Sequence, residues 1–320
     1  MSINWVEFHG RSTAIGEALE MPVRYFGSRS GGVVRRYASA LRQTQLYLES
    51  ERPDTIFVMQ PPVPALLACV PYARRRGALL VGDIHTGALT NPKWAWARAL
   101  IERVLRKHGF AIVTNSQLAD MMRDRGVETL VLDDLITART SSLDFDDVSL
   151  RQKADVPYIL TPFAYANDEP VREWLEAARR TPEITVILTG RAPANLIETA
   201  PPNVRFTGFV SSADYQRLVG RAIGIAALTT RDMTMQRAGY EALEHGRPVL
   251  TSDFPVLRQY FSKGAVFARP DVDALADGIR QLCQLAGTLE VEMVELRELK
   301  LAEQVASISA LESVLKERRS

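Results

Sequence analysis

The chain has 320 residues, of which 46% are hydrophobic and 24% charged, as expected for a soluble globular protein of two domains. No apolar run reaches the roughly 18 residues of a membrane span, and the first residues lack the basic and apolar regions of a signal peptide. Cys69 and Cys283 have no Cys-x-x-Cys partner, and the four histidines show no metal-ligand spacing. We therefore expect a protein of a reducing cytosol, with no structural zinc.

The formal net charge of +1 is unevenly distributed along the chain. Residues 1–110 contain 15 Lys and Arg against 8 Asp and Glu, whereas the remainder contains 24 against 30. A basic first part indicates either an anionic partner (phosphates, nucleic acid or an anionic membrane surface) or simply a solvated basic face.

The first part of the chain alternates between short apolar runs and segments with helical periodicity. The predicted strands are 3–8, 23–26, 54–60, 79–84, 111–114 and 129–132. The predicted helices are 13–19, 33–49, one that starts at the prolines of 61–64, 92–107, and 115–125, which Asn115 or Ser116 caps. Residues 135–156 are polar and acidic with little periodicity, and we interpret them as a linker.

A second alternating set follows the linker. Its predicted strands are 158–162, 185–189, 204–207, 223–227, 248–251 and 265–268. Its predicted helices are 169–180, 213–219, 235–244, 256–261 and 272–285, followed by a long separate helix at 291–316. Such alternation predicts an α/β fold with two doubly wound, Rossmann-like parallel sheets and a ligand cleft between the domains. We place the domains at 1–150 and 151–290, with residues 291–320 as a C-terminal helix that packs across them.

The most informative stretch of the chain is the run from Met235 to Asp253. It predicts a short helix that His245 and Gly246 end, then a buried strand and an exposed polar loop. Glu241 lies within that helix, close to the edge where parallel sheets bind ligands.

These segments together resemble a known class of enzymes. Val204 to Val210, then Tyr215, then 222–228 and 235–253 are similar to the C-terminal donor domain of GT-B glycosyltransferases, with family 4 as the closest large group. The motifs at 59–64 and 81–86 resemble the acceptor domain of the β-1,4-mannosyltransferase of lipid-linked oligosaccharide synthesis. The resemblance implies an acceptor-binding first domain and a second domain that binds a nucleotide sugar.

The resemblance to family 4 assigns the ribose of the donor to Glu241, which matches the last acid of the Glu-x7-Glu pattern. A carboxylate suits this role because it accepts two hydrogen bonds from a vicinal diol. The other acid of the pattern is replaced by Met233, with Asp232 one position away. The departure leaves open which residue contacts the sugar.

The donor diphosphate requires positive partners. The turn formed by Thr234, Met235 and Gln236 offers the backbone N–H groups of a helix N-terminus, although Met235 could equally be a core residue. The basic pair that family 4 places after the first strand of the donor domain is missing, and an acidic loop at 162–170 takes its position. Arg191 is the first candidate for the missing cation and Arg11 the second.

In the first domain, His85 follows a predicted strand and is the candidate catalytic residue, either as general base or as a ligand of the donor. Asp83 could do similar work, although its position on the strand is expected to point it the other way. Lys93 and Trp94 are candidates for contact with a membrane or an acceptor, whereas we expect Trp96 to be structural. Asp144 and Asp146 resemble a metal-binding pair, but they lie in the linker.

We therefore expect a glycosyltransferase that moves a hexose from a nucleotide-diphosphate sugar to a saccharide or polyprenyl-linked acceptor in polysaccharide synthesis. It should need no metal or other cofactor and bind no nucleic acid, and it should act in the cytoplasm, with peripheral contact at the inner face of the membrane. Two alternatives stay open: a non-catalytic subunit of a glycan assembly complex, and a nucleotide-sugar epimerase on the same fold.

Overall fold

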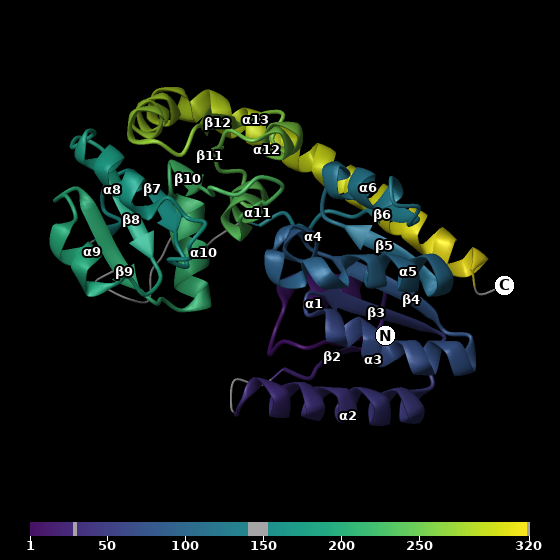
Figure 1. Ribbon diagram of the computed structural model, residues 1–320. Helices are drawn as coiled ribbons and strands as arrows, with labels where there is room; N and C mark the ends of the chain where they lie inside the picture. The colour runs from purple at the N-terminus through teal and green to yellow at the C-terminus, as the bar shows by residue number, and fades with distance from the viewer. Residues whose placement is uncertain (28–30, 140–152, 319–320) are drawn as a thin grey trace. The chain divides into compact units, whose positions relative to one another are not determined.

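The structure is a computed structural model that describes residues 1–27, 31–139 and 153–318. Contacts between residues divide the chain into two compact units, one formed by Met1–Leu135 and the chain from Glu303 onward, the other by Ile136–Ala302. Each unit contains a parallel six-stranded sheet flanked by helices (Figure 1). The predicted α/β class, with two doubly wound sheets, is confirmed.

The first sheet has the strand order β2-β1-β3-β4-β5-β6. Its strands are β1 (Ser2–Asn4), β2 (Val23–Tyr25), β3 (Thr55–Gln60), β4 (Leu79–Ile84), β5 (Gly109–Val113) and β6 (Thr129–Val131). The strands β3, β4 and β5 are buried along their whole length, as expected for apolar runs with helices on both faces.

The helices of the first unit lie on both faces of this sheet. They are α1 (Gly10–Ala18), α2 (Val33–Glu51), α3 (Val63–Arg76), α4 (Thr86–Thr90), the 3₁₀ helix η1 (Pro92–Ala97), α5 (Arg98–His108) and α6 (Ser116–Arg123). Gly82 of β4 faces α5, since an added Cβ would lie 2.9 Å from Leu105 Cδ1. Val81 packs in a core cluster with Ile15 of α1 and Leu311 near the C-terminus. Alternation along β4 therefore turns its odd-numbered residues toward α1.

The second sheet has the order β12-β11-β10-β7-β8-β9. Its strands are β7 (Tyr158–Pro162), β8 (Thr185–Thr189), β9 (Val204–Gly208), β10 (Gly224–Ala227), β11 (Val249–Ser252) and β12 (Ala265–Ala268). The sheet grows from β7 through β8 to β9, and β10 then pairs with the opposite edge of β7. The order of the strands thus reverses between β7 and β10.

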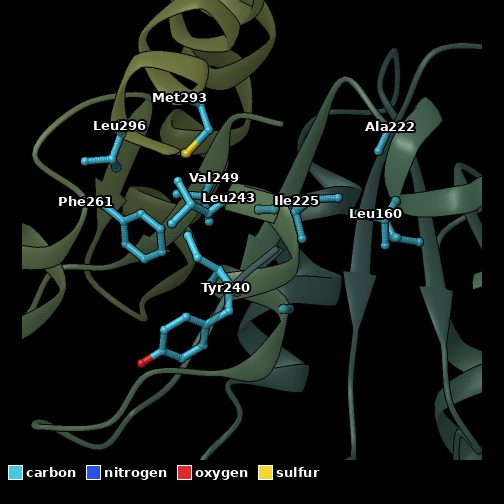
Figure 2. Close-up of a cluster of buried hydrophobic side chains, with 14 of the residues drawn as sticks. Leu160, Ala222, Ile225, Tyr240, Leu243, Val249, Phe261, Met293 and Leu296 are labelled. Carbon is cyan, nitrogen blue, oxygen red and sulfur yellow. The ribbon is translucent and has the colours of Figure 1, made fainter. Parts of the chain in front are cut away.

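The core of the second unit consists of two clusters, one on each face of its sheet. The helices are α8 (Val171–Arg179), α9 (Ala194–Thr199), α10 (Ser212–Arg221), α11 (Arg237–Glu244), α12 (Pro255–Tyr260) and α13 (Val272–Glu317). In the cluster of Figure 2, Leu160 and Ile225 of the sheet share a core with Leu243 of α11 and Met293 of α13. The cluster on the other face contains Trp174 of α8 and the first turns of α13.

The last helix differs from the prediction of two helices at 272–285 and 291–316, which is wrong. The helix α13 continues from Val272 to Glu317 without interruption. Gly287 lies between the two predicted helices in the sequence but within α13 in the structure, and an added Cβ there would meet no described atom within 4 Å. The final turns place Leu311 and Leu315 in the core of the first unit.

Part of the predicted linker, including Asp144 and Asp146, lies outside the described residues. Among the described residues, no helix is long and apolar enough to cross a membrane.

Candidate functional site

The reversal of strand order in the second unit brings together the loops that follow β7 and β10. Open α/β sheets bind ligands at this position, at the carboxyl ends of the strands. The N–H of Thr230 donates to the carbonyl of Asp168 at 2.7 Å, which links the two loops. Ser252, at the end of β11, donates to the carbonyl of Thr229 at 2.6 Å and accepts from the N–H of Thr229 at 2.9 Å. The loops of three neighbouring strands therefore form one hydrogen-bonded frame.

The loop after β7, predicted as acidic, is organised by its own carboxylate. Glu169 accepts hydrogen bonds from the N–H groups of Ala164 at 3.0 Å and Ala166 at 2.9 Å. Burial raises the pKa of Glu169, and these hydrogen bonds oppose the rise. Because its carboxylate binds backbone N–H groups of the same loop, Glu169 stabilises the conformation of this loop.

Gly190, at the end of β8, allows a close approach to the same loop. Its φ is +90°, and an added Cβ would lie 2.2 Å from the carbonyl oxygen of Phe163. The next residue, Arg191, is exposed, and its guanidinium carbon lies 5.4 Å from the centre of the Phe209 ring. Within the described part of the chain no carboxylate pairs with Arg191. Its charge therefore stays available to an anion, as the predicted role requires.

The turn before α11 replaces the acid that family 4 places eight residues before Glu241. Met233 has the left-handed φ of +55°, and its N–H donates to Asp232 Oδ1 at 2.6 Å. Thr234 donates to the carbonyl of Asp232 at 3.3 Å. The carboxylate of Asp232 thus stabilises a strained turn, which supplies a structural reason for an acid at this position.

The N-terminus of α11 is the predicted phosphate cradle. The helix begins at Arg237, two residues later than predicted, because Gln236 is extended (φ −75°, ψ 143°). The side chain of the N-cap residue, Gln236, makes no capping hydrogen bond. Met235 is partly buried and packs against the core cluster, which favours the structural reading of its side chain. A helix N-terminus favours an anion, although the N–H of Gly239 already donates to the carbonyl of Gln236 at 2.9 Å.

Glu241 lies one turn further along α11, with its carboxylate held on both oxygens. The Tyr215 hydroxyl donates to Oε2, and Arg237 Nε lies 3.4 Å from Oε1. Burial raises the pKa of Glu241, whereas Tyr215 and Arg237 favour the ionised form. Burial and the adjacent carboxylate also raise the pKa of Tyr215 well above its usual value. The side chain of Glu241 keeps 13% of its exposure, and a carboxylate held in this way retains lone pairs for a diol.

A second carboxylate on α11, Glu244, was not predicted as part of the site. Its side chain is 2% exposed and lies 3.1 Å from Arg139 Nε and 3.6 Å from Arg237 Nη2. Arg237 thus bridges Glu241 and Glu244 and fixes the direction of the first carboxylate. The spacing of 241 and 244 on one helix face could have indicated this pair, but nothing local in the sequence indicates Arg139.

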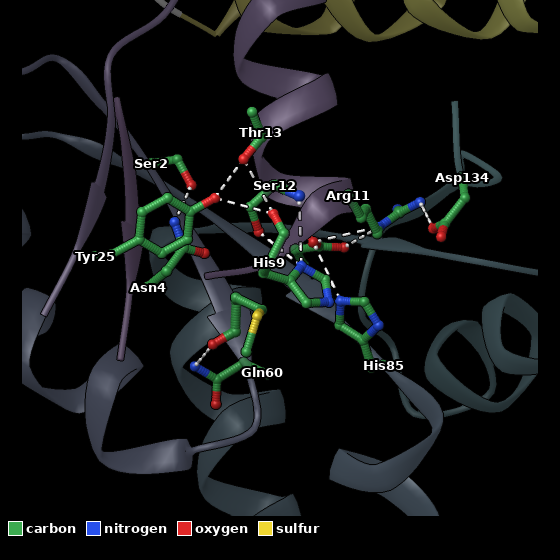
Figure 3. Close-up of polar contacts among 12 residues, drawn as sticks. Ser2, Asn4, His9, Arg11, Ser12, Thr13, Tyr25, Gln60, His85 and Asp134 are labelled. Carbon is green, nitrogen blue, oxygen red and sulfur yellow. Dashed lines mark hydrogen bonds and ion pairs between the residues drawn. The ribbon is translucent and has the colours of Figure 1, made fainter. Parts of the chain in front are cut away.

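The first unit contains a separate cluster of charged and aromatic residues at the carboxyl ends of its strands. Arg11 is buried, with Nε 3.0 Å from Asp83 Oδ1 and Nη1 3.0 Å from Asp134 Oδ1 (Figure 3). The charge of Arg11 is therefore already balanced by two carboxylates. This arrangement argues against the predicted contact of Arg11 with the diphosphate and favours a structural role.

His85 and Asp83 lie together in this cluster. His85 Nε2 is 3.4 Å from Asp83 Oδ2, so the expectation that Asp83 points the other way is wrong. Residues two apart share a strand face, and this direction continues past the end of β4. Burial disfavours the charge of Asp83, but Arg11 and His85 override it and hold its pKa well below the usual range.

His9 completes the cluster. Its ring packs edge-on against His85, with centroids 4.9 Å apart, and its Nδ1 accepts from the N–H of Ser12 at 3.4 Å. Burial lowers the pKa of His9, and the neighbouring His85 lowers it further. Both effects favour the neutral form of His9. Of the two ring nitrogens of His85, Nε2 is the one that faces the carboxylate of Asp83.

The exposures of Trp94 and Trp96 are opposite to those that their predicted roles require. Trp94 is 7% exposed and Trp96 is 66% exposed. Residues 92–97 form a 3₁₀ helix instead of the start of the α-helix predicted from Pro92. Lys93 lies over the Trp94 ring, with Nζ 5.1 Å from its centre. Trp94 therefore cannot present its ring to a membrane or an acceptor.

The two sheets, their topology and the long last helix define the GT-B fold of glycosyltransferases, and the chain resembles this class. Residues 165–284 match the protein family described as glycosyl transferases group 1. No curated protein matched the sequence. The finer resemblance to the lipid-linked mannosyltransferase stays a prediction.

Solved structures with a similar fold share little sequence with this chain. Sucrose-phosphate synthase from Thermosynechococcus elongatus has 13% identity and a TM-score of 0.74, covering 99% of this chain and 98% of that one. HepE from Anabaena, solved with UDP and glucose, has 15% identity and a TM-score of 0.68, covering 95% and 89%. A candidate UDP-N-acetylglucosamine 2-epimerase from Listeria monocytogenes has 12% identity and a TM-score of 0.56, covering 88% and 79%. At these identities the likeness establishes the fold alone.

Proposed function

We propose that the protein transfers a hexose from a nucleotide-diphosphate sugar to a saccharide or polyprenyl-linked acceptor. The observation that carries the proposal is the position of the family match. The matching segment, 165–284, contains most of the loop after β7, the loop after β10 and the helix that holds Glu241. The sequence signal of group 1 glycosyl transferases therefore coincides with the place where this fold binds ligands.

In this proposal the second unit binds the donor through three features. Glu241 accepts hydrogen bonds from the ribose diol, and Tyr215 and Arg237 hold its carboxylate in place. The N-terminus of α11, at Gln236, receives the diphosphate on backbone N–H groups. Arg191 supplies the cation that the acidic loop after β7 lacks. HepE was solved with UDP, with UDP and glucose, and with UDP-glucose, so uridine donors are the first to test.

The reaction needs stabilisation of the leaving diphosphate and removal of a proton from the acceptor. A helix dipole and an arginine provide the first without a metal ion. His85, oriented by Asp83, provides the second as a general base in the first unit. Arg11 acts indirectly, because its ion pair keeps Asp83 charged and in position.

Two other functions remain candidates. The absence of an acid at position 233 favours a subunit that binds a nucleotide sugar without transferring it. The similarity to the Listeria protein favours an epimerase, although such an enzyme would need a denser set of acids than the described residues show at this site.

The deciding experiment titrates the protein with UDP-, GDP- and ADP-sugars, and then supplies the donor that binds together with saccharide and lipid-linked acceptors. Transfer of the sugar is the expected result. Binding without transfer or hydrolysis supports the non-catalytic subunit, and interconversion of two donors supports the epimerase. If no nucleotide sugar binds, the proposal fails.

A further inference from the structure

The first unit contains an apolar groove that the proposed transfer reaction does not use. It lies between α2 and α3, which pack side by side at one side of this unit (Figure 1), and has a volume of about 550 Å³. The residues that form its walls and floor include Val34, Tyr37, Leu41, Leu67, Pro71 and Trp5. A cavity of this size and composition is typical of a site for an apolar ligand.

The groove is open to solvent along α2. Val34 is 83% exposed and Leu41 is 38% exposed, and the neighbouring Val33 is 56% exposed. Val34, Tyr37 and Leu41 recur at helical spacing, so a continuous apolar stripe of α2 faces outward beside the groove. Exposure of contiguous apolar surface indicates a binding surface.

The same surface is positively charged. Residues 31–48 contain Arg35, Arg36 and Arg42 and no acidic residue, and residues 55–76 contain no acidic residue either. Arg35 and Arg42 are exposed. The acids nearest in α2 are Glu49, which pairs with Arg75 and Arg76, and Glu51. Arg35 and Arg42 each follow a residue of the apolar stripe, and within α2 and α3 no acid precedes Glu49.

We propose that the groove between α2 and α3 is a membrane-docking site that takes the hydrocarbon chain of an anionic lipid. Apolar surface combined with arginines gives the two signals that stable binding to an anionic membrane requires. Binding of this groove to a membrane requires neither the donor nor the acceptor of the proposed transfer reaction.

Two other occupants fit the surface less well. A second copy of the chain, related by a two-fold axis, would bring the arginines of α2 against the same arginines of its partner. A peptide would need partners for its backbone, but the lining offers few polar groups, among them Gln45 and the Tyr37 hydroxyl. A hydrocarbon chain needs no such partner.

The first test measures co-sedimentation with vesicles of phosphatidylcholine alone and of phosphatidylcholine with phosphatidylglycerol. We expect binding only to the anionic vesicles and weaker binding at high salt. The R35Q/R42Q variant should bind roughly thirtyfold more weakly, whereas R103Q/R172Q, which removes the same charge from exposed positions on other helices, should bind as the wild type does. Equal binding of both variants, or no binding to anionic vesicles, overturns the proposal.

The second test asks whether a lipid chain enters the groove. Trp5 lies in the groove and is 7% exposed, so brominated acyl chains should quench its fluorescence. Trp5→Phe should remove the quenching, and Trp96→Phe should retain it, because Trp96 lies on η1. The opposite result places the membrane contact at η1, and binding without quenching excludes chain entry; either overturns the proposal.

A third comparison does not depend on Trp5, whose indole donates to Thr44 at 2.9 Å and whose loss could weaken the fold. V34S/L41S should reduce vesicle binding about tenfold or more. Leu46→Ser, at a 62% exposed position of the same helix outside the groove, should not. If V34S/L41S instead converts a dimer to a monomer and leaves vesicle binding unchanged, the occupant is a second copy and the proposal is wrong.

Discussion

Two glutamates of α11 differ in role although they lie one helical turn apart. Glu241 retains some exposure, whereas Glu244 is buried between Arg139 and Arg237. Glu241→Gln should keep an acceptor for the Tyr215 hydroxyl and leave thermal stability nearly unchanged. It should weaken donor binding about tenfold or more, because the ribose hydroxyls lose their hydrogen bonds to a charged carboxylate. Glu244→Gln should instead lower the free energy of unfolding by about 3 kcal/mol. Calorimetric titration and chemical denaturation of both variants test this, and the reverse pattern would refute the assignment.

Asp83 and Asp134 share Arg11, but only Asp83 reaches His85. Asp83→Asn should lower kcat about a hundredfold, because His85 loses the group that orients it for proton transfer. Asp134→Asn is the matched control: it should lower stability through Arg11 and leave kcat nearly unchanged. Equal kcat values of the two variants would reduce Asp83 to a structural role.

At the scale of elements, the loop after β7 depends on the glycine that ends β8. Gly190→Ala would combine an unfavourable φ with a contact of 2.2 Å to the carbonyl of Phe163. Gly208 has a similar φ of +70°, but an added Cβ would meet no described atom within 4 Å. Gly208→Ala should therefore lower the free energy of unfolding by about 1 kcal/mol, and Gly190→Ala by about 2 kcal/mol more. Gly190→Ala should also weaken binding of the donor. Equal losses of stability in urea would contradict the close packing of this loop.

The end of α11 should make stability depend on pH. Burial and the nearby Arg139, Arg247 and Arg297 lower the pKa of His245 to about 4. The unfolded residue titrates near about 6.5, so the unfolded chain binds more protons in between. The free energy of unfolding should therefore fall as the pH is lowered from about 6.5 to 4. His245→Gln should flatten this dependence and can keep the contact with Gln216; parallel profiles for the two proteins would show that His245 does not contribute.

The elements that the sequence predicts well are those with a strong apolar pattern. The strands β3, β4 and β7 were located to within a residue because every side chain, or nearly every one, is buried. Helix α9 was missed because none of its residues is buried, so it has no apolar periodicity. The burial of Trp94 and the exposure of Trp96 were not predicted, because both side chains are large and apolar and nothing local in the sequence shows which one faces the core.

At the scale of the whole molecule, the sequence predicts the class of fold but not the long-range pairs that complete the sites. Arg11 is 72 residues from Asp83 and 123 from Asp134. Arg139 and Glu244 are 105 residues apart. No local pattern connects such residues, since only the order of the strands brings them together. The position of Glu241 on α11 could be predicted because it follows from a motif within one helix, whereas its contact with ribose stays a prediction.

We propose that the second unit binds a nucleotide-diphosphate sugar at the reversal of strand order, with Glu241 on the ribose. The decisive measurement is calorimetric titration of wild type and Glu241→Gln with UDP-, GDP- and ADP-sugars. We expect saturable binding of one nucleotide class by the wild type, weakened about tenfold or more in the variant. Equal affinity in both proteins, or no binding by either, would show that this proposal is wrong.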